Sequence, residues 1–339
     1  MSHRPFRYWL ALHPDVQRPV GGVKQMHRLA EALAFHGRDV SIIQDSSDFH
    51  PGWFSSNVTT IALLDWNKLD LDPLNDVVIV PETYITSLPA YRPELPKIIF
   101  NQNSSYTFGL PSSRVGNAKI PVLNIWRAYL GKSVSHVLCV SQYDHSFFTK
   151  LLGLPSDKVS LVVNALEADV FSPSYSKKKV ISYMPRKNSP DAQIVHKLLN
   201  SFLPPGWCIR PIVNCSLYEV AQILADSSIF LSFGHPEGFG LPVAEALASA
   251  CYVVGYSGLG GRELFKHGSR YGAATEVAYG DFFGFVTAVC SAITRFDENS
   301  SLVLHSLHDS SNFIRDYYSI ASMRTSVYSA INAIEARRF

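Results

Sequence analysis

The sequence has little of what marks secreted, membrane-spanning or nucleic-acid-binding chains. Its five cysteines are spread out without a C-x-x-C pair, so neither a disulfide framework nor a structural zinc site is expected. No apolar run approaches the ~18 residues of a membrane-spanning helix. The 30 Lys and Arg residues nearly balance the 28 Asp and Glu residues, which argues against a dedicated nucleic-acid-binding protein. These absences favour a cytoplasmic globular protein.

The N-terminal segment is also poor in secretory features. Residues 1–12 read MSHRPFRYWLAL, with a short apolar core and no small-residue cleavage site. We therefore expect a first β-strand there and no signal peptide.

The apolar content is high enough for substantial cores. Hydrophobic residues make up 47% of the chain and charged residues 17%, which excludes a disordered, collagen-like or coiled-coil protein. A length of 339 residues, at roughly 150 per domain, indicates two domains or one large α/β unit.

Short apolar runs alternate with amphipathic stretches along most of the chain. The runs are rich in β-branched residues and bounded by polar or turn residues, as buried strands are. Strand–helix alternation with short links predicts parallel, doubly wound sheets. The expected strands are residues 8–12, 40–43, 77–80, 98–100, 137–140, 180–183, 208–213, 229–233 and 252–254. The expected helices are residues 23–33, 216–225, 241–250 and 262–266.

A polar segment near residues 165–178 interrupts the alternation and divides the chain. We expect one Rossmann-like domain over residues 1–165 and another over 166–318. The tail from residue 281 onward has helical spacing and no strand signal.

Residues 103–133 fit neither pattern, because they are rich in Gly, Pro and Ser. A long link without regular structure inside a compact domain is often functional. Between residues 97 and 150 the basic residues outnumber the single acid, Asp144, and alternate with aromatic residues. The stretch is either an ordinary solvated face or a surface for an acceptor or an anionic membrane, where each clustered cation contributes ~1 kcal/mol.

Residues 233–248 carry the clearest chemical pattern. A buried strand ends at Phe233, a glycine-rich turn follows, and an apolar helix starts near Leu241. Glycines let a ligand approach the main chain, and the unpaired N–H groups at a helix start favour an anionic group. Glu237 precedes the helix, and Glu245 lies about one turn inside it.

Two acids beside such a helix start indicate a ligand with two kinds of group. A carboxylate would repel a phosphate, so Glu237 and Glu245 are better suited to hydroxyl groups, with ~1.5–3 kcal/mol for each hydrogen bond. A ligand with sugar hydroxyls at both ends and phosphates in the middle is a nucleotide sugar. The alternative is a chance pair of surface acids.

The segment resembles the signature of the retaining GT-B glycosyltransferases of family four, in which two glutamates are separated by seven residues. Four further segments resemble that family in order along nearly the whole chain: residues 21–33, 140–141, 163–173 and 257–263. The resemblance implies two facing Rossmann-like domains, the acceptor side in residues 1–165 and the nucleotide-sugar side in 166–318. It also implies a C-terminal helix, residues 319–339, that crosses back to the first domain.

The resemblance implies donor-binding roles at the matching positions. Glu245 would hold the nucleotide ribose, and Glu237 would contact hydroxyls of the donor sugar as a catalytic residue. Arg186 and Lys187 occupy the place of the basic pair that steadies the diphosphate, where their charges suit phosphate oxygens. Main-chain contacts to the sugar-phosphate end would come from Phe239, Gly240 and Leu241.

The first domain would contribute to the same ligand. Gly21 and Gly22 would approach the diphosphate from that side. Many relatives place a histidine after the strand near residue 100, on the acceptor side of the donor sugar. This chain has Asn101, Gln102 and Asn103 there, so we expect an amide to make the polar contact.

The implied reaction moves a hexose-type sugar from a UDP- or GDP-sugar to a hydroxyl of a glycan, lipid-linked or other acceptor, in polysaccharide or glycoconjugate biosynthesis. The anomeric configuration would be retained. Two cationic side chains and a helix start stabilise the leaving diphosphate, so no metal and no other cofactor is expected. No nucleic acid is expected as a partner, whereas peripheral contact with the inner face of a membrane is. A sugar-phosphate synthase or epimerase on the same scaffold, and a catalytically weak nucleotide-sugar-binding subunit, are the alternatives.

Overall fold

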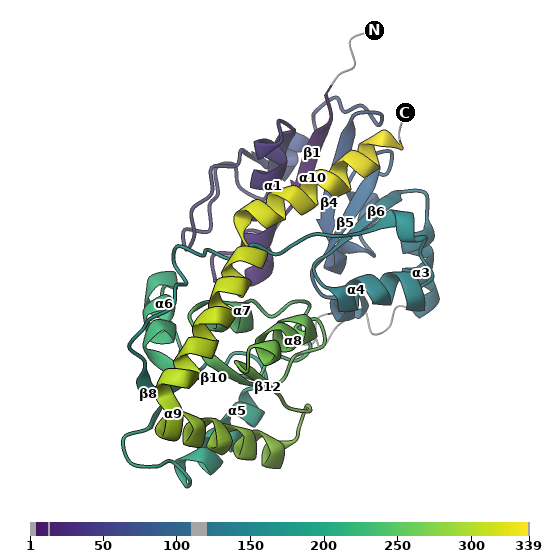
Figure 1. Ribbon diagram of the computed structural model, residues 1–339. Coiled ribbons are helices and arrows are strands. Elements are labelled where there is room, and N and C mark those ends of the chain that lie inside the picture. The colour runs from purple at the N-terminus through teal and green to yellow at the C-terminus, as the bar shows by residue number, and fades with distance from the viewer. Residues whose placement is uncertain (1–4, 13, 110–120, 338–339) are drawn as a thin grey trace. The chain divides into compact units, whose positions relative to one another are not determined.

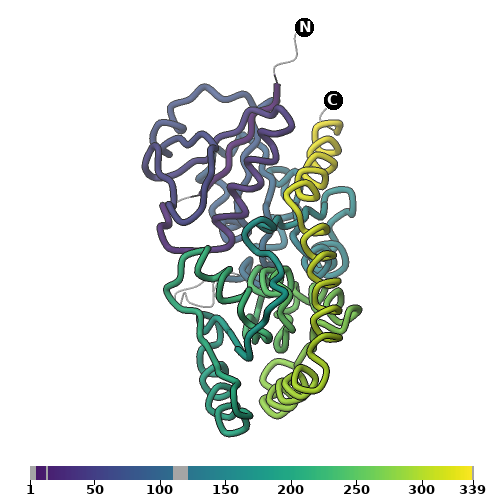
Figure 2. The backbone as a smooth tube through the Cα atoms, turned by 60° about the vertical axis from the view of Figure 1, so that its left-hand side comes forward, coloured from purple at the N-terminus to yellow at the C-terminus, as the bar shows by residue number. Residues whose placement is uncertain are grey.

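The computed structural model describes residues 5–12, 14–109 and 121–337. The chain forms two compact units (Figures 1 and 2). The first contains Met1–Ala165 and Ala321–Phe339, and the second contains Leu166–Ile320. Each unit has one parallel β-sheet with helices packed against it, so the expected pair of α/β domains is present.

The first unit has a seven-stranded sheet in the order β3-β2-β1-β4-β5-β6-β7. Its strands are continuous apolar runs, because a parallel sheet between helices buries both of its faces. The strand order reverses between β1 and β4, which is where open parallel sheets bind ligands, beyond the carboxyl ends of the strands. The strands are β1 (Arg7–Ala11), β2 (Asp39–Gln44), β3 (Thr60–Ala62), β4 (Asp76–Pro81), β5 (Lys97–Asn101), β6 (Val134–Cys139) and β7 (Val159–Leu161).

The helices of the first unit include those expected near residues 23–33 and in the C-terminal tail, together with others that the sequence does not predict. The expected helix between the first two strands is α1, which ends before Gly37, a residue with the left-handed φ of 73° that favours glycine. The helices are α1 (Gly21–Phe35), α2 (Leu63–Trp66), α3 (Val122–Leu130), α4 (Gln142–Ser146) and α10 (Ile320–Ala336).

One of the helices that were not expected is α3, because residues 103–133 were expected to lack regular structure. That prediction was wrong for two parts of the stretch: a short 3₁₀ helix covers Ser104–Phe108, and α3 covers Val122–Leu130. Ile125 and Tyr129 stand four residues apart and bury one face of α3 in the core, which stabilises the helix despite the glycines and prolines around it. Residues 110–120 lie outside the described residues.

The last helix belongs to the first unit, as expected. The Glu335 carboxylate on α10 accepts a hydrogen bond from the Tyr8 hydroxyl (2.7 Å) and pairs with Arg38 (2.7 Å). The Ser326 hydroxyl accepts a hydrogen bond from the main-chain N–H of Val163 at 3.0 Å. Figure 1 shows α10 running beside α1 and β1.

The second unit has a five-stranded sheet in the order β12-β11-β10-β8-β9. Its order reverses between β8 and β10. The ends of this unit meet, since the main-chain N–H of Leu166 donates to the carbonyl oxygen of Tyr318 (2.8 Å). The strands are β8 (Lys178–Tyr183), β9 (Cys208–Pro211), β10 (Ser227–Ser232), β11 (Tyr252–Gly255) and β12 (Ala274–Glu276).

Ser216 and Asp281 cap the starts of two helices in the second unit. Ser216 and Glu219 form a capping box, in which each side chain bonds the other's main-chain N–H, at the start of α6. The helices are α5 (Ser189–Asn200), α6 (Leu217–Asp226), α7 (Leu241–Ala248), α8 (Arg262–Arg270) and α9 (Phe282–Tyr317), the last with a kink at Asn299. No helix in the described part of the chain is long and apolar enough to cross a bilayer.

Candidate functional site

The point where the second sheet reverses its order brings together Lys187 and Glu237. Lys187 lies in the turn after β8, and Glu237 in the turn after β10. The Lys187 Nζ is 2.8 Å from the Glu237 Oε2 and also donates to the carbonyl oxygen of Pro236 (3.1 Å). The two side chains are 27% and 20% exposed, so the pair is shielded but accessible.

Arg186 precedes Lys187 in the same turn and has an exposed side chain. The structure thus brings one member of the predicted basic pair against Glu237 and leaves the other at the surface of the same turn.

Asn188 was not predicted, although it ties the two turns together. Its Nδ2 donates to the carbonyl oxygens of Phe233 (2.8 Å) and His235 (3.1 Å). Its backbone is left-handed, with φ 48° and ψ 47°, a conformation that asparagine tolerates better than most residues. An Asn directly after a basic pair at a strand end is the signal that was available.

A glycine-rich loop before α8 fixes the main chain around Glu237. The N–H of Glu237 donates to the carbonyl oxygen of Gly258 (2.7 Å). The N–H of Gly260 donates to the carbonyl oxygen of Glu237 (3.0 Å). A Cβ atom at Gly260 would lie 1.9 Å from the carbonyl oxygen of Gly238, so a side chain there would collide with main chain. This close approach explains the glycines of residues 257–263.

The helix after the motif starts as the sequence predicts. Gly240 precedes α7 with a φ of 91°, and a proline lies in the first turn, where its missing N–H costs nothing. Phe239 is buried as a whole residue, with its ring 5.0 Å from that of Tyr318. Leu241 is half-buried, and Glu245 inside α7 is 8% exposed.

The charged groups that act on His235, in the turn after β10, are Glu237, Lys187 and Arg262. The ring of His235 stacks on that of Tyr279, with centroids 4.2 Å apart. Burial lowers the pKa of His235, which leaves its ring neutral near pH 7. Among the residues that the structure describes, no group of three His, Cys, Asp or Glu side chains could hold a metal ion.

In the first unit, the structure brings Gln102 against Gly22. Gly21 and Gly22 begin α1, after β1, and Gln102 directly follows β5. A Cβ atom at Gly22 would lie 2.9 Å from the Gln102 Oε1, so glycine makes room for that amide. These residues gather where the first sheet reverses its order.

The three amides at the carboxyl end of β5 differ in exposure. Asn101 and Asn103 are buried, and the Asn103 Oδ1 accepts a hydrogen bond from the N–H of Ser105 (3.1 Å). Gln102 is only half-buried. Of the three predicted acceptor-side residues, Gln102 therefore has the accessible side chain.

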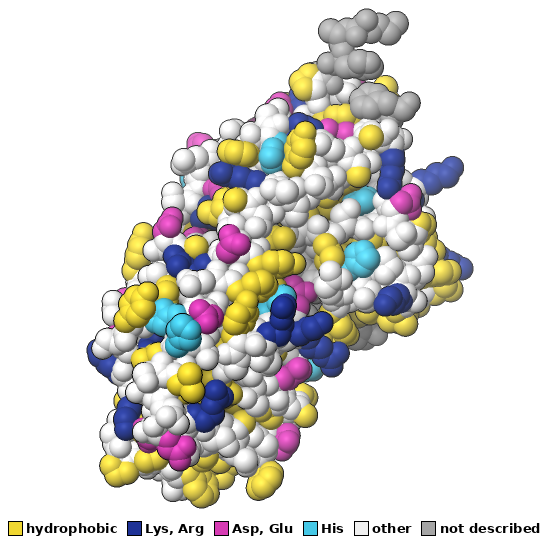
Figure 3. All heavy atoms as spheres, in the orientation of Figure 1, with side chains coloured by type: hydrophobic (Ala, Val, Ile, Leu, Met, Phe, Trp, Pro, Cys, Tyr) yellow, Lys and Arg dark blue, Asp and Glu magenta, His cyan; other side chains and the backbone are white. Residues whose placement is uncertain are grey.

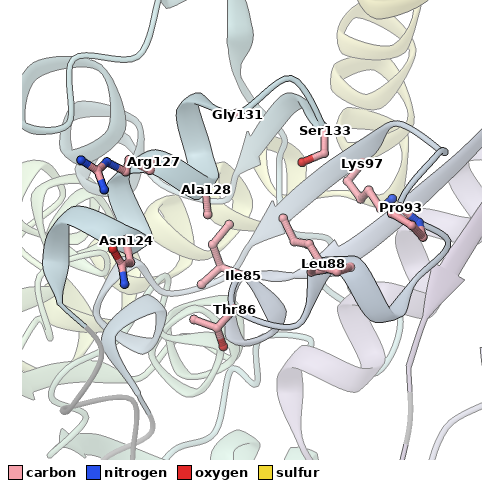
Figure 4. A pocket seen from close by; sticks show the side chains of 11 residues that line it. Ile85, Thr86, Leu88, Pro93, Lys97, Asn124, Arg127, Ala128, Gly131 and Ser133 are labelled. Atoms are coloured by element: carbon pink, nitrogen blue, oxygen red, sulfur yellow. The ribbon is translucent and has the colours of Figure 1, made fainter.

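A cavity of about 510 Å³ lies elsewhere in the first unit. Figure 4 shows Ile85, Leu88 and Ala128 converging on it, from the segment after β4 and from α3. Lys97, at the amino end of β5, also lines it, and burial lowers the pKa of this lysine to about 8. None of the predicted site residues lines this cavity.

Comparison with known proteins agrees with the fold. No family model matches the chain. The chain is 26% identical, over 235 residues, to an alpha-1,6-glucosyltransferase of Actinobacillus pleuropneumoniae serotype 7 (strain AP76). The match covers 65% of this chain and 64% of that protein, so the chain spans just under two thirds of its relative.

Solved structures match over nearly the whole chain. Sucrose-phosphate synthase from Thermosynechococcus elongatus superposes with a TM-score of 0.71 at 11% identity, covering 98% of this chain and 100% of that one. Anabaena HepE in complex with UDP superposes with a TM-score of 0.70 at 10% identity, covering 97% and 100%. A glycosyltransferase from Rickettsia africae ESF-5 gives 0.65 at 14% identity, covering 98% and 99%. The chain has the GT-B fold.

Proposed function

We propose that the protein is a retaining hexosyltransferase of GT-B family four that uses a UDP- or GDP-sugar. One observation carries the proposal: a lysine and a carboxylate meet at 2.8 Å where the second sheet reverses its order, beside the start of α7. A parallel sheet binds ligands at that point, and a helix start attracts their phosphates. The resemblance to a glucosyltransferase and the fold of UDP-binding HepE support it.

Each residue has a role in this proposal. Lys187, Arg186 and the N–H groups at the start of α7 stabilise the diphosphate as its charge grows. Glu237 holds hydroxyls of the donor sugar, and Glu245 holds the ribose. The main chain of Phe239, Gly240 and Leu241 lies along the sugar-phosphate end, and Gly21 and Gly22 let the diphosphate approach α1.

The proposed step exchanges one bond at the anomeric carbon for another. The bond from that carbon to the phosphate oxygen breaks, and a bond to the acceptor oxygen forms on the same face. The acceptor proton passes to the leaving phosphate. This route needs no protein nucleophile, metal or other cofactor, because the cations stabilise the leaving group.

A lipid-linked glycan is the proposed acceptor, reached at the inner face of a membrane. The surface of α3 supports this assignment, since Val122, Leu123, Trp126 and Leu130 are exposed on one short helix. The Trp126 Nε1 donates to the carbonyl oxygen of Leu152 (2.7 Å), which brings exposed Leu151 into the same patch. We call these five side chains, with Arg127, Lys132 and Lys150, the α3 patch.

The α3 patch combines apolar and positive groups. Figure 3 shows hydrophobic and basic side chains interleaved along the edge of the molecule where α3 lies in Figure 1. Apolar side chains insert among lipid tails, while each nearby cation adds ~1 kcal/mol on an anionic bilayer. The proposed products are therefore polysaccharide or glycoconjugate precursors.

Nucleotide binding and sugar transfer together test the donor site. A thermal-shift panel of UDP-, GDP-, ADP- and dTDP-sugars identifies the donor, and calorimetry measures the affinity for UDP and GDP. Glu245→Ala is expected to weaken binding about 10- to 100-fold, the equivalent of the ~1.5–3 kcal/mol of a charged hydrogen bond. Glu237→Ala is expected mainly to lower turnover.

Asp226→Ala is the matched control, since Asp226 pairs with Lys178 at the other end of β8. It should change neither property. Unchanged binding of both nucleotides by Glu245→Ala would contradict the proposed donor site. A protein that binds a nucleotide sugar but never consumes it is a binding subunit, and a phosphorylated sugar product identifies a synthase.

A further inference from the structure

Two buried carboxylates lie on either side of β5 in the first unit. Glu82 directly follows β4, and Asp144 lies in α4, which follows β6. The strands β4 and β6 are the two neighbours of β5. Glu82 is 2% exposed and Asp144 is 0% exposed.

Both acids bind main-chain N–H groups of the loop that leaves β5. The Glu82 Oε2 accepts a hydrogen bond from the N–H of Gln102 at 2.9 Å. The Asp144 Oδ1 accepts one from the N–H of Ser104 at 3.0 Å. The loop is therefore held from both sides, one residue before and one residue after Asn103.

Asp144 is itself fixed by the start of its own helix. Its Oδ2 accepts a hydrogen bond from the Ser141 hydroxyl (3.1 Å), and its N–H donates back to that hydroxyl (3.2 Å). Ser141 is the residue that caps α4. The hold on Ser104 is thus rigid.

Such a pair of acids is costly to bury. Burial raises the pKa of Glu82 to about 8 and that of Asp144 to about 6, and the charge of Asp144 adds to the rise at Glu82. In the described part of the chain neither acid forms an ion pair with Lys, Arg or His. A sheet that needed only a core at this place would be more stable with apolar residues.

The hold on the main chain of Gln102 fixes where its side chain goes. The amide of Gln102 packs over Gly22 in the first turn of α1, and it is the accessible amide of the three. A side chain whose backbone is held by buried groups keeps its position while a ligand binds. Gln102 is therefore preorganised where the first sheet reverses its order.

We propose that Glu82 and Asp144 are positioning residues that hold the 102–104 loop so that the Gln102 amide meets the sugar substrates. This inference rests on the proposed function, because it assigns Gln102 to the reacting sugar. It adds two residues that touch no substrate and act through Gln102.

A double-mutant cycle tests the coupling. Glu82→Gln keeps the size of the side chain but replaces one carboxyl oxygen with an NH₂ group, which adds buried N–H donors. Because small misplacements of a contact can cost up to ~100-fold in rate, we expect Glu82→Gln to lower kcat/KM at least ~10-fold in the wild-type background. In a Gln102→Ala background, Glu82→Gln should lower kcat/KM less than about threefold, since the side chain that Glu82 positions is gone.

Asp76→Asn is the matched control. Asp76 is a buried acid at the amino end of β4, where it binds Arg7 and Trp9. It should lower the melting temperature, while its effect on kcat/KM stays the same whether residue 102 is Gln or Ala. Asp144→Asn, which keeps an oxygen for Ser104, is expected to act more mildly than Asp144→Ala.

Amide hydrogen exchange gives a readout that does not depend on transfer. The N–H of Gln102 should exchange faster in Glu82→Gln, and that of Ser104 in Asp144→Ala. If sugar is transferred but the effects at positions 82 and 102 simply multiply, the inference is wrong and the proposed function stands. If wild-type protein transfers no sugar from any donor, the proposed function fails and the inference with it.

Discussion

The ammonium group of Lys187 lies 2.8 Å from the carboxylate of Glu237, across the point where the second sheet reverses its order. The two residues come from different turns, 50 positions apart in sequence, and meet because β8 and β10 are neighbours. A partly exposed pair of this kind adds little to stability, at most about 1 kcal/mol. In the proposed donor site, the pair places a cation for the diphosphate beside the acid assigned to the sugar hydroxyls.

Lys187→Ala should therefore damage function far more than stability. We expect a loss of ~100-fold in kcat/KM, since a cation on the leaving group acts mainly in the transition state, with a melting temperature within a few degrees of wild type. Lys178→Ala is the control, because Lys178 pairs with Asp226 at the opposite end of the same strand. Steady-state kinetics and thermal unfolding of both variants measure the two effects. Equal losses in activity would contradict a role for Lys187 at the site.

Gly260→Ala should disturb Glu237 without touching it directly. The new methyl group would collide with the carbonyl oxygen of Gly238, 1.9 Å away, and such overpacking typically costs ~1–3 kcal/mol. We expect lower stability in urea unfolding and weaker nucleotide binding in calorimetry. Gly280→Ala is the control, since Gly280 has open space around its Cβ position and only its φ of 82° opposes alanine. Unchanged nucleotide binding by Gly260→Ala would show that the loop packing does not shape the site.

The buried acids predict a pH dependence of stability. Glu82 and Asp144 keep their protons in the folded chain up to pH values of about 8 and 6, whereas the ordinary pKa values are 4.5 and 3.8. Unfolding releases these protons, so their contribution to the free energy of unfolding falls as pH rises through these windows. In Glu82→Gln, the free energy of unfolding should fall less steeply between about pH 5 and 8 than in wild type. In Asp144→Asn, it should fall less steeply between about pH 4 and 6. Urea unfolding across pH 4–8 checks this, and curves parallel to wild type would contradict it.

The α3 patch predicts binding to anionic vesicles. Protein should co-sediment with phosphatidylglycerol-containing vesicles, less so at high salt, and hardly with phosphatidylcholine alone. The double variant Val122→Ser, Leu130→Ser should bind roughly tenfold more weakly, because two apolar side chains no longer insert. Phe283→Ser with Leu302→Ser removes two exposed apolar side chains of α9 and is the control. A control variant that weakens binding equally would argue against the patch.

The sequence predicts every central strand from its apolar run, and it also predicts the edge strand β9. β4 reads Asp-Val-Val-Ile-Val-Pro and is buried along nearly its whole length. β3, β7 and β12 escape prediction, because each has three residues and lies at a sheet edge, where few side chains are buried. α5 escapes because its first turn is polar and its start depends on the left-handed backbone of Asn188.

The sequence likewise predicts only part of the candidate site. It predicts Glu237 and Glu245 because they share one segment with the glycines and the helix start. The contact between Lys187 and Glu237 requires the sheet order, which local patterns do not specify. Glu82 and Gln102 likewise meet because β4 and β5 are neighbours, although an acid directly after a buried strand was a signal.

The return of α10 to the first unit makes residues 166–320 a single cassette inserted into another domain. A hydrogen bond between Leu166 and Tyr318 joins its two ends. A second hydrogen bond, between Val163 and Ser326, joins the chain segments that flank it. An insert with adjacent ends can be exchanged as one piece between homologous scaffolds, whereas a cut at Ala165 alone would strip α10 from Tyr8 and Arg38. Under the proposed function, one contiguous stretch of gene therefore carries donor preference, and replacing it leaves the half assigned to the acceptor intact.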